Sequence, residues 1–213
     1  MMINKVLNEI FSARSNVTIM RTMKNSLVGL SGREISRMAG ISPKTCLETL
    51  TTLESLGLVN RIRGGRDHLF SFNRNNYLVK KLILPLLDAE SGYRESIFKR
   101  ISTVLVLHSV GVYLFGSVAR GEETIESDFD ICILYKNETS KIWLEYLVSR
   151  LIPLMYKNYG INIAPFYLSV NDFVDRAQHN KSPVPEIIKD GIVISGIQIK
   201  RLLNGKKSTK VND

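Results

Sequence analysis

The chain has 213 residues, of which 44% are hydrophobic and 23% are charged. This composition excludes a disordered chain, and the length suits one large domain or two small ones. Lysine and arginine number 29 against 20 aspartate and glutamate residues, so the formal net charge is +9. Such an excess favours polyanionic partners, among them nucleic acids, nucleotide phosphates and anionic membranes.

The positive charge is concentrated in the N-terminal part of the chain. Residues 1–95 hold fourteen cations and eight anions, an excess of six. Residues 96–213 hold fifteen cations and twelve anions, an excess of three. This division favours two functional units, although charges scattered over a solvated surface would give the same split.

The sequence predicts a cytoplasmic protein. Its most apolar stretch, residues 103–115, is shorter than the roughly 20 residues that a membrane-spanning helix needs. Asn4 and Lys5 interrupt any apolar region of a signal peptide. Cys46 and Cys132 lie far apart, which indicates buried thiols in a reducing compartment and not a disulfide framework.

Several helices are predicted at the start of the chain. Apolar residues recur at helical spacing from Ile3 to about Leu27, which indicates one or two helices. Ser31 and Glu34 form a capping-box pattern that begins the next helix, and Gly40 ends it.

A further helix and a β-hairpin follow. Ser42 and Pro43 are an N-cap and a first-turn proline, and the helix that they begin runs to Leu56. Its predicted apolar stripe comprises Cys46, Leu47, Leu50, Leu53 and Leu56. Residues 58–63 and 68–72 are predicted strands, and a glycine pair forms the turn between them.

The segments GREISRMAGISPKT (residues 32–45) and LESLGLV (residues 53–59) carry a family resemblance. They are similar to helix 2, the recognition helix and the wing entry of the winged helix-turn-helix regulators of bacteria and archaea. The resemblance covers about residues 16–75. It implies a transcriptional regulator that binds double-stranded DNA.

The DNA-binding residues follow from this assignment, because a recognition helix reads base edges with its early exposed residues. Those residues are Lys44, Thr45, Glu48 and Thr49. The cations of the predicted wing, which can pair with phosphates or enter a minor groove, are Arg61, Arg63 and Arg66. Arg33 and Arg37 are weaker candidates for phosphate contacts. The alternative stays open that all these charges are solvated on a fold used for protein contact.

Residues 77–95 are predicted to be helical, with either a dimerisation role or a connecting role. The predicted division places a DNA-binding domain at residues 1–76, a second domain at 96–204 and a basic disordered tail at 205–213.

The second domain contains two strands separated by a polar loop. Residues 110–115 form an apolar, β-favouring run that leads into Gly116 and Ser117, and Asp128 and Asp130 open the next strand. Residues two apart in a strand point to the same face, so the two carboxylates are expected side by side. Adjacent carboxylates favour a hard cation such as Mg²⁺, and a glycine permits close approach of a phosphate. The pattern therefore predicts a site for Mg²⁺ and a nucleoside triphosphate.

The run GSVARGEETIESDFDI (residues 116–131) resembles the signature of the polymerase-β-like nucleotidyltransferase superfamily, and the resemblance covers about residues 96–203. It implies a mixed sheet flanked by helices, and hence an α+β chain. The residues that it implies for nucleotide binding are Gly116, Ser117 and Arg120. The residues that it implies for catalysis and metal binding are Asp128 and Asp130.

The predicted third strand departs from this family pattern. Active members usually place a third carboxylate on this strand, but residues 160–167 contain no Asp or Glu. Asn162 stands near that position, and its amide cannot act as a base and is a weak metal ligand. Pro165 also disfavours a regular central strand. These departures indicate nucleotide binding with weak or lost transfer activity.

Three functional hypotheses remain open. In the first, the chain is a DNA-binding regulator whose second domain binds Mg²⁺ and a nucleoside triphosphate. In the second, it is an active transferase that moves NMP to a hydroxyl group of a protein, an RNA or a small molecule, including a variant that modifies a toxin. In the third, the second domain serves only dimerisation. The expected partners are double-stranded DNA, a nucleotide and a second copy of the chain, with no membrane.

Overall fold

A computed structural model describes residues 3–65 and 67–204. The contacts divide the chain into two compact units, unit 1 (residues 1–92) and unit 2 (residues 93–213). The boundary between the units falls within residues 77–95, for which either a dimerisation or a connecting role was expected. No helix of the described residues is long and apolar enough to span a membrane.

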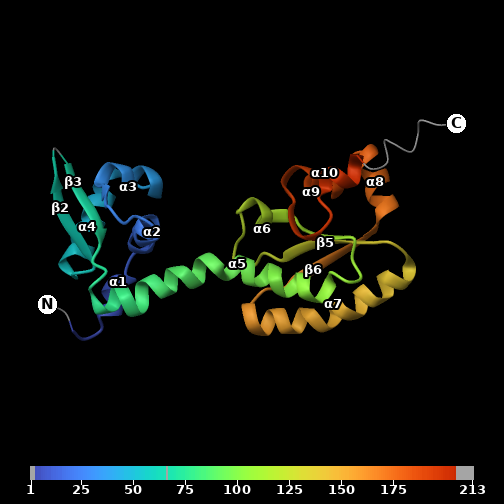
Figure 1. Cartoon of the computed structure of the whole chain (residues 1–213), viewed down its shortest axis with the longest axis horizontal. Helices are drawn as coiled ribbons and strands as arrows, with labels where there is room; N and C mark the ends of the chain where they lie inside the picture. Colours follow the sequence, from blue (N-terminus) through green and yellow to red (C-terminus); the bar gives the residue numbers. More distant parts are fainter. Residues whose placement is uncertain (1–2, 66, 205–213) are drawn as a thin grey trace. The chain divides into compact units, whose positions relative to one another are not determined.

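Unit 1 combines short helices with a small antiparallel sheet (Figure 1). Its helices are α1 (Val6–Ile10), α2 (Arg14–Met23), α3 (Gly32–Ala39), α4 (Pro43–Ser55) and the π-helical turn η1 (Val79–Ile83). Its strands are β1 (Leu30–Ser31), β2 (Val59–Gly64) and β3 (Asp67–Phe72), in the sheet order β1-β3-β2. α3 and α4 follow each other across a short turn, and the β2–β3 hairpin follows α4.

The helix starts in unit 1 confirm the predicted caps. The Ser31 hydroxyl accepts a hydrogen bond from the Glu34 backbone N–H, and the Glu34 carboxylate accepts one from the Ser31 N–H. This capping box holds the pKa of the Glu34 carboxyl below its ordinary value. Ser42 accepts from the Thr45 N–H at 3.1 Å, and Pro43 occupies the first turn of α4.

α4 buries a different stripe from the one predicted. Cys46, Thr49, Leu50 and Leu53 are buried, which is the i, i+3, i+4, i+7 pattern of one helical face. Leu47 was expected to face inward, but it is 53% exposed. The expectation is wrong because it selected apolar residues, whereas helical geometry decides which positions face the core.

A single long helix, α5 (Leu84–Leu105), begins in unit 1. Val79, Ile83 and Leu87, on η1 and the start of α5, pack into the core of unit 1. Their burial explains why the start of this helical segment, expected either to dimerise or to connect two domains, belongs to unit 1.

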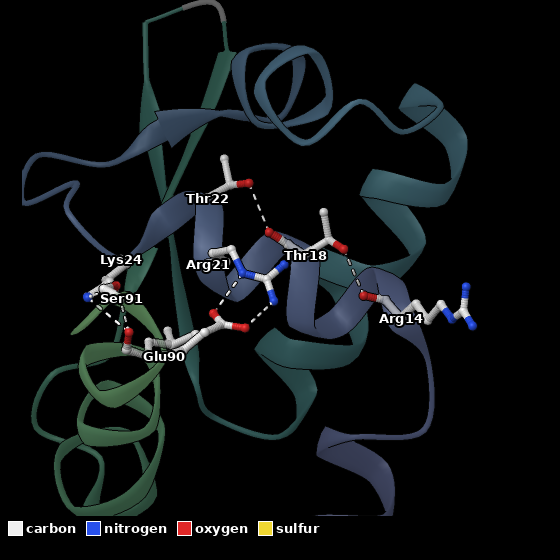
Figure 2. A network of polar contacts seen from close by, with 8 residues as sticks. Arg14, Thr18, Arg21, Thr22, Lys24, Glu90 and Ser91 are labelled. Carbon is white, nitrogen blue, oxygen red and sulfur yellow. Dashed lines mark hydrogen bonds and ion pairs between the residues drawn. The ribbon is translucent and has the colours of Figure 1, made fainter. Parts of the chain in front are cut away.

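A polar network also holds the start of α5 to α2 (Figure 2). Arg21 donates two hydrogen bonds to the Glu90 carboxylate, at 2.8 and 2.6 Å. The Lys24 ammonium donates to the Leu87 carbonyl and the Ser91 hydroxyl. Apolar packing and charged pairs therefore fix the same stretch of helix.

Unit 2 contains a four-stranded mixed sheet. Its strands are β4 (Gly111–Leu114), β5 (Phe129–Tyr135), β6 (Ile163–Ser169) and β7 (Ile192–Gly196). Its helices, besides the later part of α5, are α6 (Gly116–Arg120), α7 (Glu138–Tyr159), α8 (Val170–Gln178), α9 (Val184–Asp190) and α10 (Ile199–Asn204). The sheet order is β6-β5-β4-β7, with β5 and β6 parallel and the other pairs antiparallel.

Helices cover both faces of this sheet (Figure 1). On one face, Ile131 and Ile133 of β5 pack with residues of α5 and α7. On the other face, Cys132 and Leu134 pack with residues of α8, α9 and α10. The alternation of β5 side chains between two cores explains why this strand is almost continuously apolar. The expected α+β class, with a mixed sheet between helices, is confirmed for this unit.

Two expectations for the strands need correction. Asp128 was expected within the second strand, but β5 begins at Phe129 and Asp128 lies just before it. Pro165 lies in β6, where a central strand was disfavoured, and β6 is an edge strand of the sheet. An edge strand leaves one side unpaired, so it accommodates a residue without an N–H.

Candidate functional site

The turn after β4 brings Gly116 against the Asp130 carboxylate. Gly116 begins α6 with a φ of 75°, and a Cβ atom at this position would collide with the Asp130 carboxylate oxygen. The Phe115 N–H donates to the Asp130 carbonyl at 3.0 Å, which fixes the turn against β5. Only glycine combines this backbone conformation with this close approach. The two motifs predicted to form one site therefore do meet.

Asn162 joins the site from the neighbouring strand. β5 and β6 run parallel and begin in register, with Phe129 opposite Ile163. The residues before the two strands are therefore adjacent, and Asn162 Nδ2 donates to Asp128 Oδ1 at 2.8 Å. The Phe129 N–H donates to the Asn162 carbonyl at 2.8 Å, which fixes the spacing of the two chains. Asn162 thus faces Asp128, as its place in the sequence suggested.

The two carboxylates have different surroundings. Asp128 is exposed, whereas Asp130 is half-buried beside Gly116. Burial, and secondarily the negative charge of Asp128, raises the pKa of the Asp130 carboxyl above its ordinary value. The ionised pair is therefore electrostatically unfavourable without a positive partner.

These residues fit a metal ion that also contacts a substrate. The described residues hold no group of three or more His, Cys, Asp or Glu side chains able to bind a metal. Mg²⁺ is commonly bound through one or two carboxylates together with substrate phosphates and water, so two carboxylates suffice for such an ion. The missing side chain at Gly116 leaves the approach to Asp130 open to a phosphate.

Arg120 and Ser117 lie on α6, next to the carboxylates. Arg120 Nε donates to Glu122 Oε2 at 2.7 Å, and this hydrogen bond raises the pKa of the guanidinium. Arg120 must exchange this partner for a phosphate if it is to bind a nucleotide. Ser117 is half-buried in the first turn of α6.

In unit 1, most of the residues predicted for DNA binding on α4 are exposed together. Lys44, Thr45 and Glu48 lie on the outward face of the helix. The Thr45 hydroxyl lies 2.8 Å from the Ser42 hydroxyl, so it takes part in the helix cap. Leu47, which sequence reasoning placed in the core, is exposed among them.

Thr49 is the exception on this helix. It was expected to be exposed, but it is only 6% exposed, and its hydroxyl donates to Ser15 Oγ at 3.0 Å. The expectation is wrong, because Thr49 fills the i+3 position of the buried stripe. It cannot contact a base edge without leaving the core.

The hairpin places two of its predicted cations on one strand. Arg61 and Arg63 are exposed and two residues apart in β2, so they share a face. Arg61 Cζ lies 5.7 Å from the centre of the Phe70 ring, and its guanidinium is 3.9 Å from Glu54. Arg66 lies outside the described residues, as does the tail at 205–213.

A depression of about 280 Å³ connects these elements, and sequence reasoning missed part of its lining. Arg33 of α3, Arg61 of β2 and His68 of β3 line it together with Leu47 of α4. His68 could have been found, because its strand pairs with the one that carries the wing cations. Leu47 was missed because its hydrophobic side chain suggested burial.

Comparison with known proteins adds one firm result. Residues 95–191 match the family model of the nucleotidyltransferase domain. The match includes the Gly116–Ser117 turn, both carboxylates and Asn162. Residues 95–191, less than half of the chain, therefore carry a nucleotidyltransferase domain. No curated protein matches the chain.

Two solved structures are similar to parts of the chain. One is a predicted DNA-binding transcriptional regulator from E. coli, with 24% identity and a TM-score of 0.35, covering 39% of this chain and 85% of that one. The other is a toxin–antitoxin with AMP-PNP, with 18% identity and a TM-score of 0.36, covering 53% of this chain and 85% of that one. TM-scores this low do not support an inference about function.

Proposed function

We propose that this chain is a DNA-binding regulator whose nucleotidyltransferase domain binds Mg²⁺ and a nucleoside triphosphate without efficient nucleotidyl transfer. Asp128 and Asp130 hold the metal ion, and Gly116, Ser117 and Arg120 contact the phosphates. Unit 1 is proposed to be a winged helix-turn-helix domain that binds double-stranded DNA.

The single observation that carries the proposal is the contact between Asn162 and Asp128. Asn162 stands beside the carboxylates at 2.8 Å, where a third carboxylate would complete the site. Its amide donates to Asp128 and cannot take a proton from an attacking hydroxyl. The site therefore keeps the carboxylates that would bind a metal ion, and it lacks a base to deprotonate an attacking hydroxyl.

The roles of the other residues follow from their positions. Asp128 and Asp130 would hold Mg²⁺, which would supply positive charge for the phosphates of a bound nucleotide. Gly116 admits the phosphate because no side chain stands between its backbone and Asp130. Arg120 supplies a positive charge at the end of α6 once it leaves Glu122.

The DNA-binding half of the proposal is supported by the surface of unit 1. Lys44, Thr45 and Glu48 on α4 are exposed, and Arg61 and Arg63 extend along β2. A helix that reads a major groove and a hairpin that contacts phosphates need this combination. Homodimerisation, which many DNA-binding domains of this kind use, stays a prediction.

The proposal is tested by incubating the pure protein with labelled ATP, GTP, CTP and UTP and Mg²⁺. We expect the wild-type chain to leave the nucleotides intact and to acquire no label. The variant Asn162→Asp restores a carboxylate beside Asp128, and we expect it to release NMP and pyrophosphate slowly, with water as the acceptor. The matched control is Asn171→Asp, which adds the same charge on α8.

Label transfer by the wild-type chain that is lost in Asp128→Asn/Asp130→Asn would overturn the proposal that the domain lacks efficient transfer. It would favour an active transferase. Equal inactivity of the wild type and Asn162→Asp, with the nucleotide bound in both, would show that the missing carboxylate is not what limits transfer.

A further inference from the structure

Unit 2 contains a cavity next to the carboxylate site, and its lining includes neither Asp128 nor Asp130. It has a volume of about 550 Å³ and lies among α5, α6, the loop at 121–127 and the starts of β5 and β6. Its apolar lining comprises Ile97, Val118, Ala119, Ile125, Phe129 and Ile161. Cavities that bind small molecules commonly measure about 300–1,000 Å³, and one of about 150 Å³ already holds benzene.

The cavity lies on the face of the sheet to which Phe129 points, and Asp130 points to the other face. Phe129 and Asp130 are neighbours in β5, and neighbouring residues of a strand point to opposite faces. Phe129 contacts Phe98 of α5 edge-on, with ring centres 6.5 Å apart, on the α5 and α7 side. A molecule in the cavity would therefore touch the back of the strands that carry the site.

One wall of the cavity is fixed by aromatic contacts. The Tyr93 hydroxyl donates to the Tyr159 carbonyl, and the rings of these two residues lie 5.9 Å apart. Ser96 and Tyr159 are hydrogen-bonded through their hydroxyls at 2.9 Å. These contacts join α5 to the end of α7, so the wall exists without a ligand.

The lining of the cavity carries the cations Arg94 and Arg120 and the anion Glu123. Arg94 lines it, with its guanidinium over the Phe98 ring at 5.9 Å, and it makes no ion pair within the described part of the chain. Arg120, also on the rim, is already paired with Glu122. Aromatic and aliphatic walls beside one uncommitted guanidinium suit a ligand with an aromatic ring and an anionic group.

We propose that this cavity binds a small aromatic anion, with its ring between Phe129 and Val118 and its anionic group at Arg94. Ser127 and Ile161 line the cavity and directly precede Asp128 and Asn162. A ligand in the cavity would therefore touch the residues next to Asp128 and Asn162 and perturb the hydrogen bond between them. The cavity neighbours the proposed nucleotide site, because Arg120 lines it as well. Its walls are present without Mg²⁺ or a nucleotide, so the proposal does not rest on the proposed function.

The experiment uses the full chain and two probes, 8-anilinonaphthalene-1-sulfonate and N-phenyl-1-naphthylamine, which share their rings but not the sulfonate. Fluorescence titration gives the affinities, and NMR of methyl-labelled protein locates the probe. We expect shifts at Ile97, Val118, Ile125 and Ile161 and at the Asn162 side-chain amide. Ile142, exposed on α7, should not move.

Two variants separate the cavity from non-specific binding. Ala119→Phe fills the cavity and should weaken both probes at least about tenfold. Arg94→Ala should weaken only the sulfonate, by up to about fivefold, as expected for an exposed charge. Arg100→Ala is the matched control, because Arg100 is an exposed cation on the same helix away from the cavity.

Methyl shifts elsewhere in the chain, or equal binding by the wild type and folded Ala119→Phe, would overturn the proposal. If Ala119→Phe fails to fold, the wild-type methyl map and the Arg94→Ala comparison still decide it. Loss of nucleotide binding in Asp130→Asn with unchanged probe binding would support a probe site that does not include the carboxylates.

Discussion

At the scale of residues, Asp130 combines a cost to stability with a role in the proposed function. Its pKa is raised by burial and by Asp128, so its ionised form is less favourable in the folded chain than in the unfolded one. The absence of a side chain at Gly116 nevertheless leaves room for that carboxylate. A partly buried, poorly compensated charge of this kind is common where a site awaits a positive ligand.

Removing that charge should stabilise the metal-free chain. We expect Asp130→Asn to raise the free energy of unfolding at neutral pH by about 0.5–1 kcal/mol, a modest value because the side chain is only half-buried. Because the pKa of Asp130 is raised in the folded chain, the full gain in the free energy of unfolding is expected above that folded pKa. It disappears below about pH 4, where the wild-type carboxyl is protonated in both states.

Urea unfolding in EDTA at neutral and acidic pH measures this difference. The control is Glu126→Gln, an exposed acid in the loop before β5, which should leave stability unchanged. A lower stability of Asp130→Asn at neutral pH would mean that the carboxylate is already compensated within the chain.

Residue-level prediction succeeded where a motif fixes the backbone and failed where it relied on polarity. The Gly116 turn and Asp130 meet because the glycine leaves no side chain between them. Thr49 is buried and Leu47 is exposed, the reverse of what was expected, because the helical period determines burial on α4. Sequence alone gave no sign that the Thr49 hydroxyl has a partner in Ser15.

At the scale of elements, polar contacts hold the start of α5 to α2 (Figure 2). Apolar residues of the same stretch pack into the core of unit 1. Arg21 lowers the pKa of the Glu90 carboxyl by hydrogen bonding to it. Both side chains are about half-exposed, so solvent screens the pair. The apolar residues Ile83 and Leu87 contribute most of the stability of this contact.

We expect Glu90→Gln to lower the free energy of unfolding by about 0.2–1 kcal/mol at neutral pH. Because the folded pKa is lowered, this contribution is present above the unfolded pKa of about 4.3 and is lost as the pH falls through the folded pKa. A double-mutant cycle with Arg21→Gln isolates the coupling between the two side chains.

The cycle uses urea unfolding monitored by circular dichroism, with Glu95→Gln as an exposed control on the same helix. Additive effects of the two single substitutions would contradict a direct interaction between Arg21 and Glu90.

Helices were more predictable than the connections after the third strand. Caps at Ser31 and Ser42 and a terminal glycine placed α3 and α4 within about a residue of their bounds. The helix α8 was missed, because its Ser169 cap follows a strand without an intervening turn signal. The parallel register of β5 and β6, which places Asn162 beside Asp128, is a long-range feature that local patterns do not determine.

At the scale of the whole molecule, the net charge separates into two local roles. The excess of positive charge lies mostly within the first 95 residues, where α4 and the β2–β3 hairpin expose cations. Unit 2 carries a smaller excess and a local pair of carboxylates. One chain therefore carries a cationic surface in its first part and a pair of neighbouring carboxylates in its second.

DNA binding should depend on salt through the hairpin. We expect Arg63→Ala to weaken binding to duplexes of different sequence about equally and to reduce the slope of log affinity against log salt by about one. Gel-shift titrations over a range of salt concentrations measure this slope.

Lys81→Ala is the control, because it removes an exposed cation from η1 and should leave the slope unchanged. An unchanged slope in Arg63→Ala would contradict a phosphate contact by the hairpin.

The most direct measurement of the central claim is calorimetric titration of a non-hydrolysable ATP analogue with Mg²⁺ into the wild-type chain and Asp130→Asn. The account predicts binding by the wild type that requires Mg²⁺ and is weakened at least about tenfold in the variant, with Glu126→Gln unaffected. Absence of binding by the wild type, or equal binding by the wild type and Asp130→Asn, would contradict it.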